Sequence, residues 1–284
     1  MKTATSAAIE AADVDELRAR LERQIASYGS VVIGFSAGVD SSVVAAAAAA
    51  ALGGNALAVT AVTETITRED RELAIGIARG LGIAHEMIAY NELDIPNYSL
   101  NPANRCYYCK DALYTRLAAL AAERGISAVL DGSNADDAGD YRPGRTAAAE
   151  QAVRSPLLEL GITKAQVRAL ATVYGLPNHD KPSAPCLSSR VPYGTPITRE
   201  ILERIAAAER ALRELGFREF RVRHHDDVGR IEVPRGEFAR AVEMADAIDA
   251  AMRDAGYRYA ALDLRGFRSG SLNEVLTQIE LPVL

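Results

Sequence analysis

Short apolar runs alternate with amphipathic segments along the first two thirds of the chain. The runs are typical of strands buried on both faces of a parallel sheet, and they cover residues 30–35, 55–63, 84–89 and 128–131. The segments between them have helical spacing, and they cover residues 13–28, 43–52, 67–81, 105–124 and 163–174. Alternating strands and helices predict an α/β fold with a parallel, doubly wound sheet. Ligands of such sheets bind beyond the carboxyl ends of the strands.

The pattern changes after Pro196. Two strongly charged segments predict amphipathic helices at 198–215 and 235–255, and three short runs predict strands at 220–225, 230–233 and 257–264. We therefore expect two domains, a sheet domain of residues 1–193 and a smaller α+β domain of residues 194–284. The second domain is expected to bind substrate or mediate assembly. Its exposed amphipathic helices indicate a homo-oligomer.

Composition narrows the class of protein. The 284 residues are 49% hydrophobic and 25% charged, as in soluble globular proteins. No apolar run reaches the roughly 20 residues of a membrane span, and acids occupy the N-terminus where a signal peptide needs an apolar core. We therefore expect a cytoplasmic protein. The net charge of −6 argues against a large nucleic-acid interface. Three cysteines do not make a disulfide framework.

The loop FSAGVDSS follows the first predicted strand and opens a helix. Gly38 allows the backbone to approach an anion closely, and the hydroxyls of Ser36, Ser41 and Ser42 can surround an oxyanion at the helix N-terminus. Asp40 is compatible with a phosphate if it holds Mg²⁺. The other interpretation is an ordinary strand-to-helix turn with a capping serine.

This loop lacks the Gly-Lys-Ser/Thr of a Walker A motif. It resembles the Ser-Gly-Gly-x-Asp-Ser signature of the PP-loop ATP pyrophosphatases, with Ala37 in place of the first glycine, and DGSNADD (131–137) resembles the second nucleotide loop of that family. The resemblance implies cleavage of ATP to AMP and pyrophosphate, with adenylation of the acceptor. It also implies nucleotide or magnesium contacts at Ser36, Gly38, Val39, Asp40, Ser41, Ser42, Thr63 and Asp136, and phosphate contacts at Lys110 and Lys181. A solvated surface lysine is the alternative for each of the last two.

The three cysteines form a C-x-x-C pair and one distant residue. Cys106 and Cys109 lie at the start of a predicted helix, and Cys186 lies in the loop APCLSSRVPYG. Three thiolates are too few for a closed structural zinc site, but they can hold a [4Fe–4S] cluster with one iron open to another ligand. Arg105 and Arg190 flank them, and a nearby cation favours the thiolate. The alternative is three small buried packing residues.

The stretches RCYYCK, DKPSAPCLSSRVPYG and VRHHDDVGRIEVP together resemble the ATP-dependent sacrificial sulfur transferases of the LarE family, over nearly the whole chain. The resemblance implies a small nucleotide substrate, pyridinium-3,5-biscarboxylic acid mononucleotide. One of its carboxylates would be adenylated and converted to a thiocarboxylate, during synthesis of the nickel-pincer nucleotide of lactate racemase.

Two sources of sulfur are implied by this family. In one branch the cysteine at the position of Cys186 gives up its own sulfur and becomes dehydroalanine. Other members use three cysteines and a [4Fe–4S] cluster that carries sulfide. Cys106, Cys109 and Cys186 fit the second branch, which we favour. A sulfide donor and the lactate racemase maturation proteins are then the expected partners.

The second domain carries paired charges. Arg221 and Arg223 lie two residues apart, hence on one face of a strand, and paired arginines suit a phosphate or carboxylate. The resemblance implies a substrate- or metal-binding cluster of Glu209, Arg221, Arg223 and Glu232. The alternative is a solvated sheet face with a cross-strand Arg223–Glu232 ion pair. We also predict that Arg190, close to Cys186, acts in catalysis and contacts an anion.

Three other functions remain open. An ammonia-dependent synthetase of the NAD or GMP type forms an amide and would not use the three cysteines. A tRNA thiolase would need a basic domain, which a net charge of −6 does not indicate. A non-catalytic nucleotide-binding regulator would leave Asp40 unexplained.

Overall fold

The computed structural model describes residues 11–139, 143–182 and 185–268. The chain forms two compact units, one of residues 1–63, 68–90 and 106–183 and one of residues 64–67, 91–105 and 184–284. Each unit has its own sheet and core. Residues 1–10, part of the stretch considered for a signal peptide, lie outside the described ranges, as do Ser183 and Ala184 before Cys186.

The first unit is built on four parallel strands. They are β1 (Val31–Gly34), β2 (Ala56–Val62), β3 (Ala84–Ala89) and β4 (Ala128–Leu130), in the order β3-β2-β1-β4. Val32 of β1 pairs with Leu57 on one side and Val129 on the other. The predicted parallel α/β sheet is confirmed. The loops that follow β1, β2 and β4 therefore leave from the same edge.

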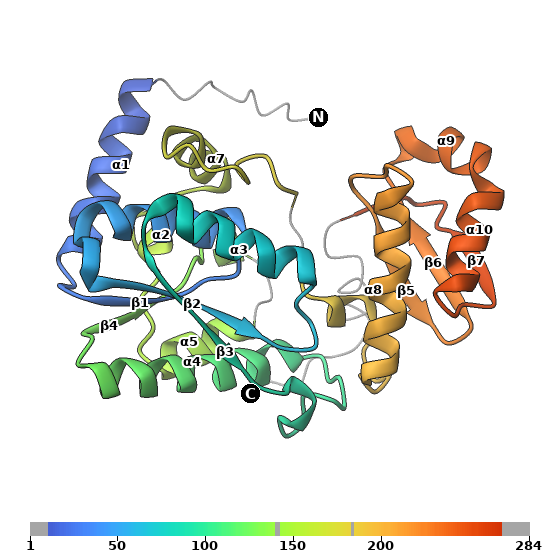
Figure 1. Cartoon of the computed structure of the whole chain (residues 1–284), viewed down its shortest axis with the longest axis horizontal. Helices are drawn as coiled ribbons and strands as arrows, with labels where there is room; N and C mark the ends of the chain where they lie inside the picture. Colours follow the sequence, from blue (N-terminus) through green and yellow to red (C-terminus); the bar gives the residue numbers. More distant parts are fainter. Residues whose placement is uncertain (1–10, 140–142, 183–184, 269–284) are drawn as a thin grey trace. The chain divides into compact units, whose positions relative to one another are not determined.

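Helices cover both faces of this sheet (Figure 1). The cluster on one face draws on α1 (Ala11–Ala26), α2 (Val39–Leu52), α3 (Arg68–Leu81) and α7 (Lys164–Val173). The other face packs against α4 (Arg105–Arg124) and α5 (Gly144–Glu150). The pattern did not predict α5 or α6 (Pro156–Glu159), because α5 presents only small alanines to the core and α6 is a single turn.

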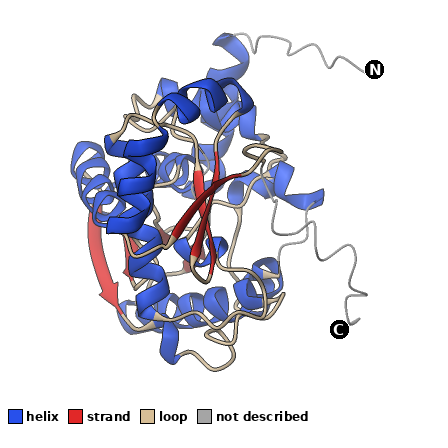
Figure 2. Cartoon of the chain, turned by 90° about the vertical axis from the view of Figure 1, so that its right-hand side faces the viewer, coloured by secondary structure: helices blue, strands red, loops and turns tan. Residues whose placement is uncertain are grey.

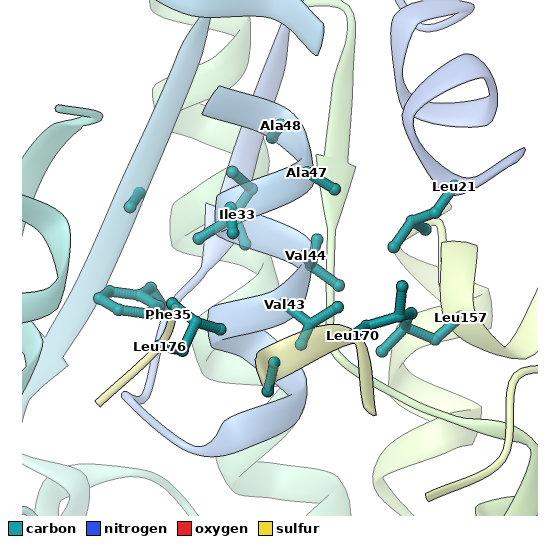
Figure 3. Packing of buried hydrophobic residues seen from close by; sticks show 14 of the residues in the cluster. Leu21, Ile33, Phe35, Val43, Val44, Ala47, Ala48, Leu157, Leu170 and Leu176 are labelled. Carbon is teal, nitrogen blue, oxygen red and sulfur yellow. The ribbon is translucent and has the colours of Figure 1, made fainter. Parts of the chain in front are cut away.

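The main core is aliphatic and built around α2. Ala47 and Ala48 are fully buried beside Ile33 of β1, and their small side chains let the helix lie close to the strand (Figure 3). Val43 and Val44 fill the next turn. Leu170 of α7 packs into the same cluster, so burial of α7 fixes the position of Lys164 at its first residue.

The second unit has a three-stranded mixed sheet. Strand β5 (Arg221–His225) pairs antiparallel with β6 (Val228–Glu232), which pairs parallel with β7 (Tyr259–Leu262). Its helices are α8 (Arg199–Glu214), α9 (Phe238–Glu243) and α10 (Ala245–Asp254). Figure 2 shows the helices of the chain in blue and its strands in red. The predicted small α+β arrangement is present.

Two predicted boundaries are wrong. The single helix expected at 235–255 is a 3-10 turn followed by α9 and α10, which are separated at Met244 (φ −97°, ψ 17°). Strand β6 begins at Val228 rather than Arg230, because Asp226 takes a left-handed conformation (φ 50°) and closes a tight turn. Aspartate tolerates this conformation better than most residues.

Within the described ranges, none of the helices combines the length and apolar character that crossing a membrane requires.

We predict that Leu170→Ala lowers the free energy of unfolding by about 2–5 kcal/mol, since it leaves a cavity between α7 and α2. Val173→Ala in the same helix is the matched control, because Val173 is 42% exposed. Urea unfolding followed by circular dichroism measures both. Equal losses in the two variants would contradict the packing described for α7.

Candidate active site

The loop after β1 presents an uncapped helix end. Gly38 is the N-cap of α2 and offers no side chain to the first-turn N–H groups. Ser41 Oγ donates to the Gly38 carbonyl at 3.1 Å and accepts from the Ser36 backbone N–H at 3.3 Å. A helix N-terminus without a side-chain cap can accept an anion in its place. Ser36, Gly38 and Ser41, all predicted, thus form one folded loop.

Strain in this loop lies at Ala37, not at Gly38. Ala37 has a φ of 54°, whereas Gly38 has a φ of −73°. An L-residue in the left-handed region costs about 1–2 kcal/mol, and the PP-loop signature has glycine at this position. The Asn178 amide offsets part of this cost, since its Nδ2 donates to the Ala37 carbonyl and to Ser42 Oγ, both at 2.9 Å. Ser42 is fully buried, so its hydroxyl supports the loop from behind.

Asp40, in the first turn of α2, is the centre of a polar cluster. Its Oδ2 accepts from Lys164 Nζ at 2.5 Å, and its Oδ1 accepts from Asn134 Nδ2 at 3.0 Å. Asp136 Oδ2 accepts from the backbone N–H of Lys164 at 2.8 Å. The structure therefore brings the predicted residues Asp40 and Asp136 to one cluster. Asn134 and Lys164, which complete it, were not predicted.

The loop after β4 is pressed against the loop after β1. Its buried Asp131 accepts from Tyr114 Oη at 2.9 Å, Ser133 Oγ at 2.8 Å and Ser155 Oγ at 2.7 Å. A Cβ on Gly132 would lie 2.7 Å from the backbone nitrogen of Ser41. Only glycine fits at this contact, because backbone atoms cannot rotate away.

The other predicted nucleotide contacts are spread over the first unit. Val39 is buried and offers only its backbone, and Thr63 follows β2 with a partly buried side chain. Lys181 Nζ is paired with Asp70 of α3 at 2.7 Å.

Lys110 lies in the neighbourhood of two thiols. Its ammonium lies 5.5 Å from the centre of the Tyr114 ring, and the pKa of Lys110 is raised, first by Tyr114 and then by Cys109, Asp131 and Cys106. Cys106 and Cys109 lie three residues apart in the first turns of α4, so both project from a similar side of the helix. Cys106 is exposed and Cys109 is half-buried.

Cys186 belongs to the second unit and is exposed. It caps a short 3-10 turn (Leu187–Arg190) whose backbone is held by Arg190. Arg190 Nη1 donates to the Pro185 carbonyl, to the Cys186 carbonyl at 3.1 Å and to Ser189 Oγ at 2.9 Å. The main chain at Cys186 is therefore fixed, and the residue is exposed. The packing interpretation of Cys186 is wrong.

Arg190 is held in turn by Glu209 of α8. Nε and Nη2 of Arg190 donate to the two carboxylate oxygens at 2.8 and 2.9 Å, and both side chains are over 90% buried. Glu209 Oε1 also accepts from the Val222 backbone N–H at 3.1 Å. Loss of one partner from such a pair costs about 3–5 kcal/mol. The many bonds of Arg190 make it a positioning residue for the cysteine loop.

The remaining predicted charges form a buried network beside this pair. Arg223 Nη2 donates to Glu232 at 2.9 Å, and its Nη1 donates to the Ser189 carbonyl at 2.7 Å. The predicted cross-strand ion pair exists, but the solvated sheet face is wrong, since Glu232 is fully buried. Burial, followed by repulsion from Arg190, lowers the pKa of Arg221 to about 10. Arg221 therefore stays charged at neutral pH, and an added anion would stabilise it.

A second set of contacts supports the cysteine loop and was not predicted. Arg105 Nη1 donates to the Ser188 carbonyl at 2.8 Å, and Tyr98 Oη lies 2.7 Å from Ser188 Oγ. Asn101 Nδ2 donates to the Pro192 carbonyl at 2.7 Å. These residues lie some 90 positions before the loop in the sequence. Only the polar character of residues 91–105 could have identified them as contacts of the cysteine loop.

Within the described residues, no group of three or more His, Cys, Asp or Glu side chains lies together with metal-binding geometry.

The chain is similar to known proteins over most of its length. The family model for asparagine synthase matches residues 14–225. Pyridinium-3,5-bisthiocarboxylic acid mononucleotide synthase of Lactiplantibacillus plantarum is 38% identical over 265 residues, 93% of this chain and 96% of that protein. The chain belongs to this LarE branch of the asparagine synthase family. An uncharacterized Synechocystis protein is 45% identical over 268 residues, 92% of this chain and 100% of its own length.

Membership confirms the resemblance drawn from the PP-loop and cysteine motifs. The match to the asparagine synthase model includes the loop after β1, the loop after β4 and α7. It ends at His225, the last residue of β5, so the family model does not reach β6, α9, α10 and β7. The likeness to the LarE relative extends over most of the second unit as well.

We predict that Gly132→Ala weakens ATP binding by at least about tenfold, because the added methyl group displaces Ser41 and the first turn of α2. Gly80→Ala is the matched control, since a Cβ there meets no atom within 4 Å. Isothermal titration calorimetry with ATP and Mg²⁺ compares the two. Unchanged affinity in Gly132→Ala would contradict a nucleotide site at this contact.

Proposed function

We propose that this protein is an ATP-dependent sulfur transferase that converts a carboxylate of pyridinium-3,5-biscarboxylic acid mononucleotide to a thiocarboxylate, in synthesis of the nickel-pincer nucleotide. The observation that carries the proposal is the exposed thiol of Cys186 on a loop fixed by the buried Arg190–Glu209 pair. The relative from Lactiplantibacillus plantarum is named for the bisthiocarboxylic acid product.

The first step is adenylation. A substrate carboxylate oxygen attacks the α-phosphorus of ATP, pyrophosphate leaves, and an acyl-adenylate forms. The N-terminus of α2, with Ser36, Gly38, Val39 and Ser41, would bind the pyrophosphate end. Thr63 would face the adenosine, and Lys110 and Lys181 would offset phosphate charge.

Asp40 fits as one ligand of a magnesium ion whose other ligands include the phosphates of the nucleotide. Mg²⁺ is commonly held by one or two carboxylates together with substrate phosphates, and Asp40 offers a carboxylate that is 25% exposed beside the uncapped helix end. Asp136 would lie near as a second acid. When bound, the ion would offset the charge of the phosphates, while Asp40 and Asn134 keep the loops in place.

The second step transfers sulfur. A sulfur nucleophile attacks the acyl carbon, AMP leaves with the former carboxylate oxygen, and the thiocarboxylate remains. Arg221 and Arg223 suit the phosphate or the second carboxylate of this substrate, with Glu209 and Glu232 holding the network in place. Burial and the charge of Arg190 lower the pKa of Arg221, so a bound anion would be favoured there.

The thiols fit a role as ligands better than a role in packing. Cys106 and Cys186 are exposed and Cys109 is half-buried, and three thiolates suit a [4Fe–4S] cluster with an open iron. Such a cluster, when bound by Cys106, Cys109 and Cys186, would supply sulfide from the open iron. The alternative is that Cys186 supplies its own sulfur and loses it by elimination to dehydroalanine.

We predict that Asp40→Ala abolishes pyrophosphate release from ATP, whereas Cys186→Ala keeps it and forms no thiocarboxylate. The two losses separate adenylation from sulfur transfer. Asp249→Ala, an exposed change on α10, is the control. Substrate-dependent pyrophosphate release and mass spectrometry of the nucleotide measure the two steps. Full activity of Cys186→Ala would refute the proposal.

The source of sulfur is tested on the polypeptide itself. After anaerobic purification and reaction with excess substrate and added sulfide, intact-mass analysis compares the protein with its starting mass. We expect an unchanged polypeptide, several product molecules for each polypeptide, and the visible absorbance of an iron–sulfur cluster. A loss of one H₂S from Cys186 would instead establish the sacrificial route.

A further inference from the structure

Lysine is scarce in this chain. Lys2, Lys110, Lys164 and Lys181 are its only lysines, while arginine supplies nearly all other cations. Arginine forms rigid two-pronged contacts, whereas lysine is a flexible point charge that can change partners. The three lysines in the described ranges all belong to the first unit. Two of them, Lys110 and Lys181, are the phosphate contacts proposed above.

Lys164 has a fixed backbone and a movable ammonium. It is the first residue of α7, directly after the capping box formed by Thr163 and Gln166. Its backbone N–H donates to Asp136 Oδ2 at 2.8 Å, so the start of the helix is tied to the loop after β4. Its Nζ is 2.5 Å from Asp40 Oδ2, and its side chain is 31% exposed. The ammonium can leave Asp40 without moving the helix.

Asp40 already has two other stabilising contacts. It lies in the first turn of α2, where the helix dipole favours a negative charge, and Asn134 Nδ2 donates to its Oδ1. Both side chains of the pair are partly exposed, so water screens their attraction and Lys164 can exchange Asp40 for another anion. ATP brings several negative charges to this end of α2, and its divalent cation competes for the Asp40 carboxylate.

We propose that Lys164 is a nucleotide-binding residue that changes partners. It neutralises Asp40 in the empty loop, and it pairs with a phosphate of ATP, and of the pyrophosphate product, when these occupy the loop. The exchange gives the Lys164 ammonium an anionic partner both before and after the nucleotide binds. The inference rests on the proposed function, because it assumes that the loop after β1 binds ATP.

The test compares Lys164→Met with Lys164→Arg by calorimetry. With Mg²⁺ present, we expect Lys164→Met to weaken ATP and pyrophosphate binding by at least about tenfold, and Lys164→Arg to recover most of the loss because it keeps the charge. Arg68→Met is the control, since Arg68 forms only an exposed pair with Glu72 on α3. Circular dichroism verifies that each variant is folded.

A double-mutant cycle separates direct contact from support of Asp40. Pyrophosphate binding is measured without metal in Asp40→Asn and in the Asp40→Asn/Lys164→Met double variant. A direct contact predicts a further loss of roughly fivefold or more in the double variant. If the second substitution adds nothing, Lys164 acts only through Asp40 and the inference is overturned.

The failure of the inference is distinct from failure of the proposed function. A wild-type chain that binds neither ATP nor pyrophosphate would overturn the proposed function. If the wild-type chain binds both ligands and Lys164→Met binds them with the same affinity, only the role given to Lys164 is overturned.

Discussion

Parallel pairing of β1 with both β2 and β4 is the constraint on which the first unit depends. Since all its strands run in one direction, the segments after β1 and β4 emerge at a common edge. The contact between Gly132 and Ser41 is possible only there. Residues more than 90 positions apart, such as Asp40 and Asn134, are thereby brought within hydrogen-bond distance without any local sequence signal.

The ion pairs near the two candidate loops differ in exposure. In the first unit, the acids Asp40 and Asp70 are partly exposed, and each is matched by a lysine. In the second unit, Glu209 and Glu232 are buried and matched by arginines. Buried pairs hold a backbone in one arrangement, as they do around Cys186. Exposed pairs with lysine leave room for rearrangement, as binding of a nucleotide requires.

Periodicity predicted the architecture well where each element buries a continuous stripe. The helix at 105–124 agrees with the structure at both ends. The strand at 84–89 also has the predicted bounds, but it is an edge strand with exposed and partly buried residues, so its predicted burial on both faces is wrong. The segment 235–255 is also amphipathic, yet in the structure it divides into two helices at Met244. No proline or glycine stands at Met244 from which a break could have been predicted. The turn before β6 depends on the left-handed conformation of Asp226, which the pattern of hydrophobic residues does not predict.

The site was predictable in its motifs and less so in its partners. Ser36, Asp40, Cys186 and Arg190 stand in short recognisable stretches. Lys164 and Asn178 are ordinary residues in ordinary segments, and only packing of α7 and the following turn brings them to the loop after β1. Arg190 was predicted to act in catalysis and to contact an anion, whereas its bonds to carbonyl oxygens and to Glu209 depend on the folded second unit.

The different exposure of the two ion pairs has a consequence for ionic strength. Salt screens charges in contact with water far more than buried ones. The Asp40–Lys164 pair is 25% and 31% exposed, whereas Glu209 and Arg190 are 7% and 4% exposed. A rise in salt concentration is therefore expected to weaken the Asp40–Lys164 pair, whereas the Arg190–Glu209 pair behind the loop that carries Cys186 is little affected.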